Sequence, residues 1–242
     1  MLRRIPAMFV LVPFLAAFVM AQGWWEGKPY TAWSKDEVNT ILDKSPWGNL
    51  VNQSIERVGH LRTSGDTVQG TESAYDKLSF HLSFITSKPV RMALARRAIL
   101  SDPGKENRTD WGKYVEQGDD QHIILVLHLT ANPFDSNVAL VLSNAMNSLQ
   151  TADLVARTFL STDGGKKVAL AKYDPLGENG YGVKFYFPRG LPDGTPLVTS
   201  ANKEIRFETV IPLPKEQIER KNITISCKWD PRKMLYNGKL EL

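Results

Sequence analysis

The chain has 242 residues, with 30 Lys and Arg against 26 Asp and Glu, and a net charge of +4. This length suits one large or two small domains, each able to bury a core. The modest charge gives little support to a nucleic-acid-binding surface. The single cysteine excludes an internal disulfide, so an exported chain of this kind would depend on its core for stability.

Residues 1–21 have the three-part pattern of a secretory signal peptide. Arg3 and Arg4 supply a positive start, an almost wholly apolar run follows, and small residues stand before a cleavage point after Ala21. The apolar run is too short to span a bilayer comfortably. We therefore expect a chain that starts near Gln22, lies in the periplasm or the medium, and has no stable membrane insertion.

A capping box predicts the first helix of the mature chain. The Ser34 hydroxyl can accept the Glu37 N–H, and the Glu37 side chain can reach back. An apolar stripe at helical spacing follows in Val38, Ile41 and Leu42. The helix is expected to close at Ser45-Pro46, because the residue before a proline disfavours the helical region.

Four of the six tryptophans gather around this helix, as Trp24, Trp25, Trp33 and Trp47. Trp33 and Trp47 flank the helix and are expected to pack, Trp33 as a hydrophobic staple on Val38. Trp24 and Trp25 are less constrained by packing, because they lie close to the expected new N-terminus. Together with Tyr30 they are the candidate binding residues, because flat aromatic faces can stack on sugars or contact a partner.

The segment from residue 50 to residue 150 is predicted to mix strands and helices. A strand is expected over 50–61 and a loop over 65–70. Alternation over 78–85 predicts a half-buried strand with Leu78, Phe80, Leu82 and Phe84 on one face. A helix is expected to open at 87–89 with Arg91 and Arg96 pointing outward. The polar stretch 101–120 predicts a long loop, 121–130 a central strand buried on both faces, and 137–150 a helix.

From residue 156 onward the pattern is all-β. The expected elements are strands over 158–162, 167–173, 181–187, 204–211, 223–229 and 234–242, separated by turns or loops at 163–165, 174–180 and 188–196. Cys227 shares an apolar strand face with Ile223, Ile225 and Trp229, which predicts a buried structural thiol.

These elements predict an α+β fold. We expect a mostly antiparallel β-sandwich of immunoglobulin-like type with an N-terminal helical segment. An α+β region over 22–150 and an all-β region over 151–242 are expected to form one compact unit.

Motifs that would assign chemistry are missing from the sequence. It has no Gly-x-Ser-x-Gly elbow, no His-Glu-x-x-His, no phosphate-binding loop and no dinucleotide glycine fingerprint. A metal site made of cysteine ligands needs more than one cysteine, and this sequence has only one. We therefore assign no catalytic residue, no metal and no cofactor.

Three groups of polar residues carry weaker signals. His81 shares a strand face with Ser79 and Ser83, so a hydrolytic site that also recruits an acid such as Asp119 is conceivable. His122 and His128 lie roughly 20 Å apart along one strand, too far for one metal ion. Asp119 and Asp120, with Glu116 nearby, lack the spacing of a Ca²⁺ loop and are expected to be a charged loop.

A cationic cluster falls on the helix that opens at 87–89. Lys88, Arg91, Arg96 and Arg97 could bind an anionic polymer, but cations near a helix C-terminus also offset the helix dipole. The structural role is the expected one.

The chain also resembles a known set of proteins. The sequence blocks that show this resemblance are Lys28-Pro29-Tyr30-x-x-Trp33-Ser34-x-x-Glu37-Val38, Ser45-Pro46-Trp47, Phe187-Pro188-Arg189 and Lys233-Met234-x-Tyr236-x-Gly238-Lys239-Leu240-Glu241-Leu242. These scattered blocks resemble uncharacterised exported proteins of acidobacterial type. The resemblance implies an exported bacterial protein and adds no catalytic residue.

Three functions are compatible with these observations. The first is a non-enzymatic envelope or secreted protein that binds a glycan or a protein partner. The second is a hydrolase acting on envelope or extracellular polymers, and the third is a structural envelope component. The oligomeric state is not predicted.

Overall fold

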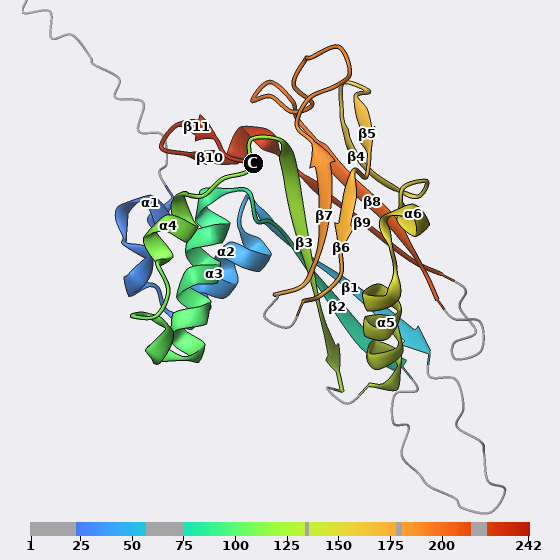
Figure 1. Ribbon diagram of the computed structural model, residues 1–242, viewed down its shortest axis with the longest axis horizontal. Helices are drawn as coiled ribbons and strands as arrows, with labels where there is room; N and C mark the ends of the chain where they lie inside the picture. The colour runs from blue at the N-terminus through green and yellow to red at the C-terminus, as the bar shows by residue number, and fades with distance from the viewer. Residues whose placement is uncertain (1–22, 57–74, 134–135, 178–180, 214–221) are drawn as a thin grey trace, which may run out of the picture.

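The computed structural model of the chain describes residues 23–56, 75–133, 136–177, 181–213 and 222–242. The expected signal peptide and the loop at 65–70 lie outside these residues, as do parts of the expected strand 50–61 and of the turn 174–180. The described chain is α+β, with two antiparallel sheets packed as a sandwich and helices grouped beside them (Figure 1). The expected fold class is thus confirmed, while the immunoglobulin-like topology stays a prediction.

The larger sheet has five strands in the order β1-β2-β3-β7-β6. These strands are β1 (Gly48–Glu56), β2 (Tyr75–Phe84), β3 (His122–Asn132), β7 (Val183–Pro188) and β6 (Lys172–Asp174). β3 lies at the centre, as the apolar residues on both its faces predicted, and Val126 on its outer face is fully buried. Strands from both halves of the chain therefore build one sheet.

The smaller sheet has four strands in the order β5-β4-β8-β9. These strands are β5 (Lys167–Ala169), β4 (Thr158–Thr162), β8 (Ile205–Pro212) and β9 (Asn222–Trp229). Burial alternates strictly along β8 and β9, and Cys227 is buried and free, as predicted. Phe207 of β8 meets Phe185 and Phe187 of β7 with ring centroids 5.2 and 6.0 Å apart, so aromatic edges fill the space between the sheets.

The single strand expected over 167–173 is wrong. The chain pairs with β4 only as far as Ala169, then crosses to the other sheet and pairs with β7 as β6. Leu170 and Tyr173 are both buried, so this crossing places apolar side chains between the two sheets.

One side of the sandwich is closed by side chains that join two edge strands. β1 and β9 are the edges of their sheets and lie side by side. The Asn49 amide donates to Lys228 O at 3.1 Å, and the Gln53 amide donates to Thr224 O at 2.7 Å. These bonds satisfy backbone carbonyls that an exposed sheet edge would leave unpaired.

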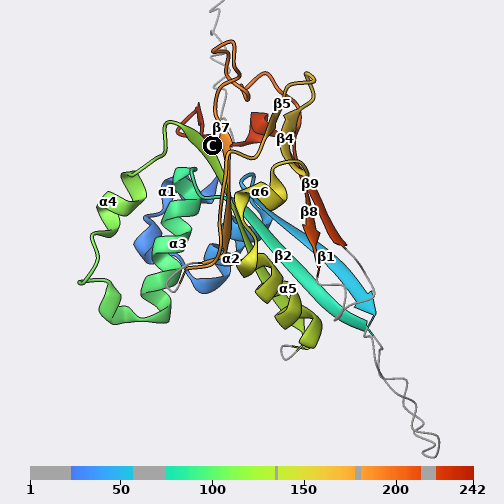
Figure 2. The ribbon, with the colours of Figure 1, turned by 45° about the vertical axis from the view of Figure 1, so that its right-hand side comes forward.

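Helices near the N-terminus and between β2 and β3 form a layer beside the larger sheet. They are α1 (Trp24–Gly27), η1 (Tyr30–Ala32), α2 (Lys35–Lys44), α3 (Lys88–Ser101), η2 (Pro103–Lys105) and α4 (Trp111–Glu116). Figures 1 and 2 both show these helices in one group. The capping box is confirmed: Glu37 N–H donates to Ser34 Oγ at 3.2 Å, and Ser34 N–H donates to Glu37 Oε2 at 2.7 Å. Trp33 and Val38 are both buried in the core.

Two expectations for this layer are wrong. The stretch 101–120 is not a loop throughout, since it contains η2 and α4. Asp110 caps α4 by accepting the Lys113 N–H, and only Val115 of this short helix is buried, so no apolar stripe marks it in the sequence. Arg91 does not point outward: it is buried, because α3 is covered by α2 on one side and α4 on another.

Two further helices, α5 (Asn137–Ser148) and α6 (Thr151–Leu154), lie away from this layer (Figure 1). The helix expected over 137–150 is present as α5, and its buried residues include Val138, Leu142 and Ala145. The Tyr173 hydroxyl donates to Met146 O at 2.7 Å and holds α5 against β6. Among the helices in the described part of the chain, none has the length and apolar character needed to cross a membrane.

The strand expected over 234–242 is instead a small hairpin. It follows η3 (Pro231–Lys233) and consists of β10 (Leu235–Tyr236) and β11 (Lys239–Leu240). Asn237 and Gly238 turn the chain with φ of 49° and 73°. Asn-Gly is the residue pair that tolerates two positive φ angles in a two-residue hairpin turn.

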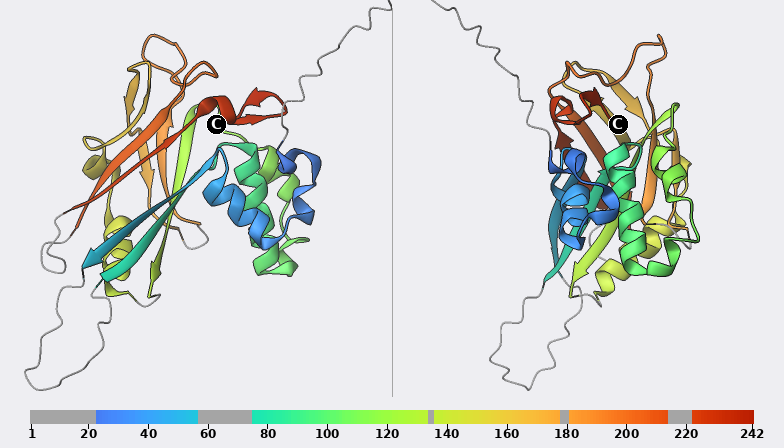
Figure 3. Two further views of the ribbon diagram at one scale, coloured as in Figure 1. Left: turned by 180° about the vertical axis from the view of Figure 1, so that it is seen from behind. Right: turned by 90° about the vertical axis from the view of Figure 1, so that its left-hand side faces the viewer.

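Residues 241–242, next to this hairpin, connect distant parts of the fold (Figure 3). The indole N–H of the fully buried Trp47 donates to Glu241 O at 2.8 Å. Glu241 Oε2 accepts the Lys88 backbone N–H at 3.1 Å, at the N-terminus of α3. Arg189, which follows β7, donates from Nη2 to Leu242 O.

We predict that Trp47→Phe lowers the free energy of unfolding by about 1–3 kcal/mol, because the Glu241 carbonyl loses its buried donor. Urea denaturation measures this loss. Trp33→Phe is the matched control: it also removes a buried indole N–H, the donor to Lys28 O at 3.1 Å. Only Trp47→Phe should speed hydrogen exchange of the Glu241 amide, which bonds to Met234 O. Equal exchange in the two variants would contradict an anchoring role for Trp47.

Candidate functional site

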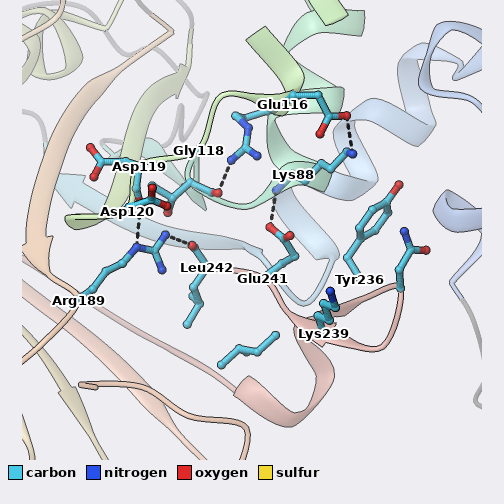
Figure 4. Close-up of a pocket in the computed structure, with 14 residues that line it drawn as sticks. Lys88, Glu116, Gly118, Asp119, Asp120, Arg189, Tyr236, Lys239, Glu241 and Leu242 are labelled. Carbon is cyan, nitrogen blue, oxygen red and sulfur yellow. Dashed lines mark hydrogen bonds and ion pairs between the residues drawn. The ribbon is translucent and has the colours of Figure 1, made fainter. Parts of the chain in front are cut away.

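The candidate site is a polar pocket of about 660 Å³ between the helical layer and the C-terminal hairpin (Figure 4). Its volume lies within the roughly 300–1,000 Å³ usual for small-molecule sites. Eight of its fourteen lining residues are charged, four of each sign. They are Lys88, Arg91, Arg189, Lys239, Glu116, Asp119, Asp120 and Glu241.

Four segments that are distant in sequence supply the walls. Lys88 and Arg91 come from the first turns of α3, and the loop between α4 and β3 brings Asp119 and Asp120. Arg189 follows β7, and the β10–β11 hairpin contributes Tyr236 as its aromatic surface. The pocket therefore exists only when both halves of the chain are folded together.

Three of the four acids in this pocket have partners within the chain. Glu116 Oε1 pairs with Lys88 Nζ, and Glu241 accepts the Lys88 backbone N–H. Asp119 Oδ1 accepts backbone N–H groups from Gln121 at 2.8 Å and His122 at 2.7 Å. Desolvation raises the pKa of Asp119, but these two donors outweigh it and keep the pKa below its usual value. Asp120 is exposed.

The two arginines of the pocket bond to main-chain oxygens. Arg91 donates from Nε to Val115 O at 2.8 Å and from Nη1 to Thr86 O. Arg189 donates from Nε to Asp119 O at 2.8 Å and from Nη2 to Leu242 O. Desolvation lowers the pKa of both guanidinium groups, and nearby acids oppose it: Glu241 and Glu116 raise the pKa of Arg91, and Asp119, Asp120 and Glu241 raise that of Arg189. Within the described residues no Asp or Glu side chain forms an ion pair with either arginine.

A smaller pocket of about 280 Å³ adjoins the first. The two share Thr86, Arg91, Gly118 and Asp119. It is lined by Tyr114 of α4 on one side and by Lys184 and Tyr186 of β7 on the other. Together the pockets follow the line where the helical layer meets the outer face of the larger sheet.

The candidate binding residues Trp24, Trp25 and Tyr30 lie in α1 and η1. Trp24 is 38% exposed, whereas Trp25 is half-buried, with ring centroids 5.8 Å from Trp24 and 5.6 Å from Trp47. Trp24 also meets Trp33 at 5.3 Å, so the four rings form one edge-to-face chain. Much of this surface is thus used for packing.

Helix α1 also touches the hairpin that walls the pocket. Glu26 Oε1 accepts the Asn237 N–H at 3.0 Å, and Asn237 lines the pocket. This bond holds the segment that carries Trp24 and Trp25 against the hairpin. Their role in binding stays a prediction.

A second polar cluster lies on the outer face of the larger sheet. His81 Nδ1 is 2.8 Å from Asp43 Oδ1, and His81 Nε2 is 2.9 Å from Thr130 Oγ1. Asp43 comes from α2 and Thr130 from β3, so the helical layer and the sheet meet here. In this histidine cluster a neutral His81 with its proton on Nδ1 can accept the Thr130 hydroxyl.

The partners expected for His81 are wrong. Ser79 Oγ donates to Asn52 Oδ1 at 2.7 Å, Ser83 is buried, and Asp119 is engaged with His122. His122 and His128 contact different aromatic rings, in line with the expected distance between them along β3. His128 stacks on Tyr181 with ring centroids 4.8 Å apart, whereas His122 meets Tyr186. In the described part of the chain no group of three or more His, Cys, Asp or Glu could hold a metal ion.

The cationic cluster on α3 is divided among separate partners. Lys88 pairs with Glu116, Arg96 Nε donates to Trp33 O at 2.8 Å, and Arg97 lies 4.4 Å from the centroid of the Tyr181 ring. Lys88 and Arg91 line the pocket, whereas Arg96 and Arg97 contact neighbouring elements. The expected offset of the helix dipole is wrong, because the last turn of α3 holds no basic residue.

Sequence patterns missed the pocket. Arg189 and Tyr236 carry no functional signal in the sequence, because Arg189 lies in a loop and Tyr236 lies in a hairpin where the sequence pattern predicts a strand. The Asn237-Gly238 pair is the signal that would have revealed this hairpin. Nothing in the local pattern shows that Arg91 and Arg189 line one pocket, since they are 98 positions apart in the chain.

Comparison of the chain with protein-family models, curated proteins and solved structures finds no match. The fold alone does not identify a function, because one sandwich architecture carries many unrelated activities. The chemistry of the pocket and of the histidine cluster therefore has to decide between the candidate functions.

We predict that protonation of His128 destabilises the fold in acid. Desolvation, followed by the charges of Arg97 and His81, lowers its pKa from 6.5 to about 4, although Asp43 acts in the opposite direction. Between these values the unfolded chain binds more protons than the folded chain, so stability falls as the pH decreases from 6.5 to 4. Urea denaturation across this window measures the slope.

His128→Asn should flatten this dependence, because the variant has no imidazole to protonate. His122→Asn, on the same strand, is the control. A slope unchanged by His128→Asn would show that His128 is not the group responsible.

Proposed function

We propose that this chain is an exported, non-enzymatic binding protein of the envelope or the medium, and that its polar pocket takes a glycan. The observation that carries the proposal is the lining of the pocket: charged donors and acceptors of both signs beside the aromatic ring of Tyr236. Sugars present many hydroxyls and one apolar face, which such a lining can match. The signal-peptide pattern of residues 1–21 supports export.

The exposed apolar surface favours a glycan over a protein partner. The large hydrophobic residues that are exposed in the described part of the chain come from separate elements: Trp24, Tyr75, Leu100, Leu140, Val155 and Leu176. Protein interfaces use contiguous apolar patches. Only Trp24 adjoins other aromatic rings, and these rings pack against one another.

A titration of intrinsic Trp fluorescence with neutral and acidic oligosaccharides tests the proposal. We expect a saturable change that Tyr236→Ala weakens at least tenfold while the melting temperature stays the same. Tyr75→Ala is the matched control, because Tyr75 is 48% exposed and outside the pocket. Loss of binding in Trp24→Ala with Tyr236→Ala unaffected would move the site to α1. No response to any oligosaccharide would contradict the glycan proposal and favour a protein partner.

The histidine cluster supports a hydrolase as the second candidate. Thr130, His81 and Asp43 have the order of nucleophile, general base and orienting acid found in hydrolytic triads. The cluster lacks what would complete such a site: in the ladder that joins β2 to β3 the backbone groups bond to each other, and neither pocket includes these three residues. A triad also needs donors for the developing oxyanion. The hydrolase therefore ranks second.

A hydrolytic Thr130 would acylate with p-nitrophenyl acetate. We expect no release of p-nitrophenol above that of Thr130→Val, which keeps the shape of the side chain and removes the hydroxyl. A rate at least a hundredfold above that of both Thr130→Val and His81→Gln would replace the binding proposal with the hydrolase.

A further inference from the structure

We infer that Asn237, in the turn of the C-terminal hairpin, is a site of spontaneous deamidation, and that this modification adds a negative charge to one wall of the polar pocket. Asn237 is among the residues that line the pocket. The inference is independent of the ligand that the pocket takes, because the only co-reactant is water.

The reaction joins two neighbouring residues of the chain. The backbone nitrogen of Gly238 attacks Cγ of the Asn237 side chain. A C–N bond forms and closes a succinimide ring, and the side-chain nitrogen leaves as ammonia. Water then opens the ring at either of its two carbonyls. The product at position 237 is therefore an aspartate or an isoaspartate, in which the backbone runs through the former side chain.

The surroundings of this residue pair leave the attack unhindered. Gly238 has no Cβ that would crowd its nitrogen, and no atom beyond its chain neighbours lies within 4 Å of the place where a Cβ would stand. Asn237 and Gly238 are both exposed, so water reaches them. Among the described residues the Gly238 N–H has no backbone acceptor, and its nitrogen is free to react.

The hairpin also gives the turn little resistance to opening. Ring closure requires the Asn237 side chain to swing onto the following peptide nitrogen, which the tight turn permits only when it opens. β10 and β11 form a sheet of their own and pair over two residues each. A two-stranded hairpin is marginally stable by itself, and such elements open locally without global unfolding.

Other asparagines provide comparisons within the same chain. Asn107 is also exposed and in a turn, but it precedes Arg108, whose side chain crowds the attacking nitrogen. The sequence has a second Asn-Gly pair, Asn179-Gly180, which lies outside the described residues.

The modification would act on a contact between the hairpin and α1. The Asn237 N–H donates to Glu26 Oε1 at 3.0 Å, so either product places a carboxylate on the residue that binds Glu26, and the two like charges repel. Isoaspartate also lengthens the backbone of a turn that pairs Tyr236 with Lys239. Both products therefore loosen the wall that carries Tyr236.

Peptide mapping by mass spectrometry tests the site. The folded chain is incubated in mildly alkaline buffer, and conversion is followed at each asparagine. Asn237 is the only asparagine in the tryptic peptide 234–239, which separates it from Asn179. We expect Asn237 to convert at least tenfold faster than Asn107. Equal rates at the two residues, or conversion of Asn237 only in urea, would overturn the inference.

Hydrogen exchange of the hairpin amides tests the consequence. Asn237→Gly is the matched variant, because glycine adopts the positive φ of this position and has no side-chain amide to lose. Incubation should speed exchange over 235–240 in the natural chain and leave it unchanged in Asn237→Gly. Equal acceleration in both chains, or unchanged exchange in a natural chain that has been converted at Asn237, would overturn the effect on the pocket wall.

Discussion

Backbone carbonyls of residues 241–242 and the Glu241 carboxylate accept donors from three distant parts of the chain. Trp47 binds Glu241 from 194 positions away, the N-terminus of α3 binds it from 153, and Arg189 reaches Leu242 from 53. All three bonds are part-buried, so their donors need an acceptor in the folded state. This short segment therefore joins the start of α3 to residues next to β1 and β7 of the larger sheet.

The polar pocket is a consequence of this joint. The hairpin that precedes Glu241 forms one wall, α3 forms another, and Arg189 bonds to the Asp119 and Leu242 carbonyls on either side of it. Glu116, Asp119 and Glu241 each have a partner within the chain, and Lys88 of α3 is the partner of both Glu116 and Glu241.

The outer face of the larger sheet shows how a polar arrangement can resemble a catalytic one and still serve packing. His81 joins Asp43 of α2 to Thr130 of β3, and His128 lies between His81 and the Tyr181 ring. These contacts satisfy polar groups where a helix covers a sheet that is not apolar on this face. The pocket differs because its charged residues and Tyr236 line a space large enough for a ligand, and we therefore propose binding ahead of hydrolysis.

Local patterns in the sequence were sufficient for the fold class, the capping box at Ser34, the core faces of β2 and β9 and the burial of Cys227, because each depends on periodicity or on residues within one turn. They failed where a neighbour in space decides the outcome. Arg91 is buried because α2 and α4 pack around α3, and the strand after β4 breaks because its second half pairs in the other sheet. The pocket belongs to the second kind, since its walls come from segments that only tertiary packing brings together.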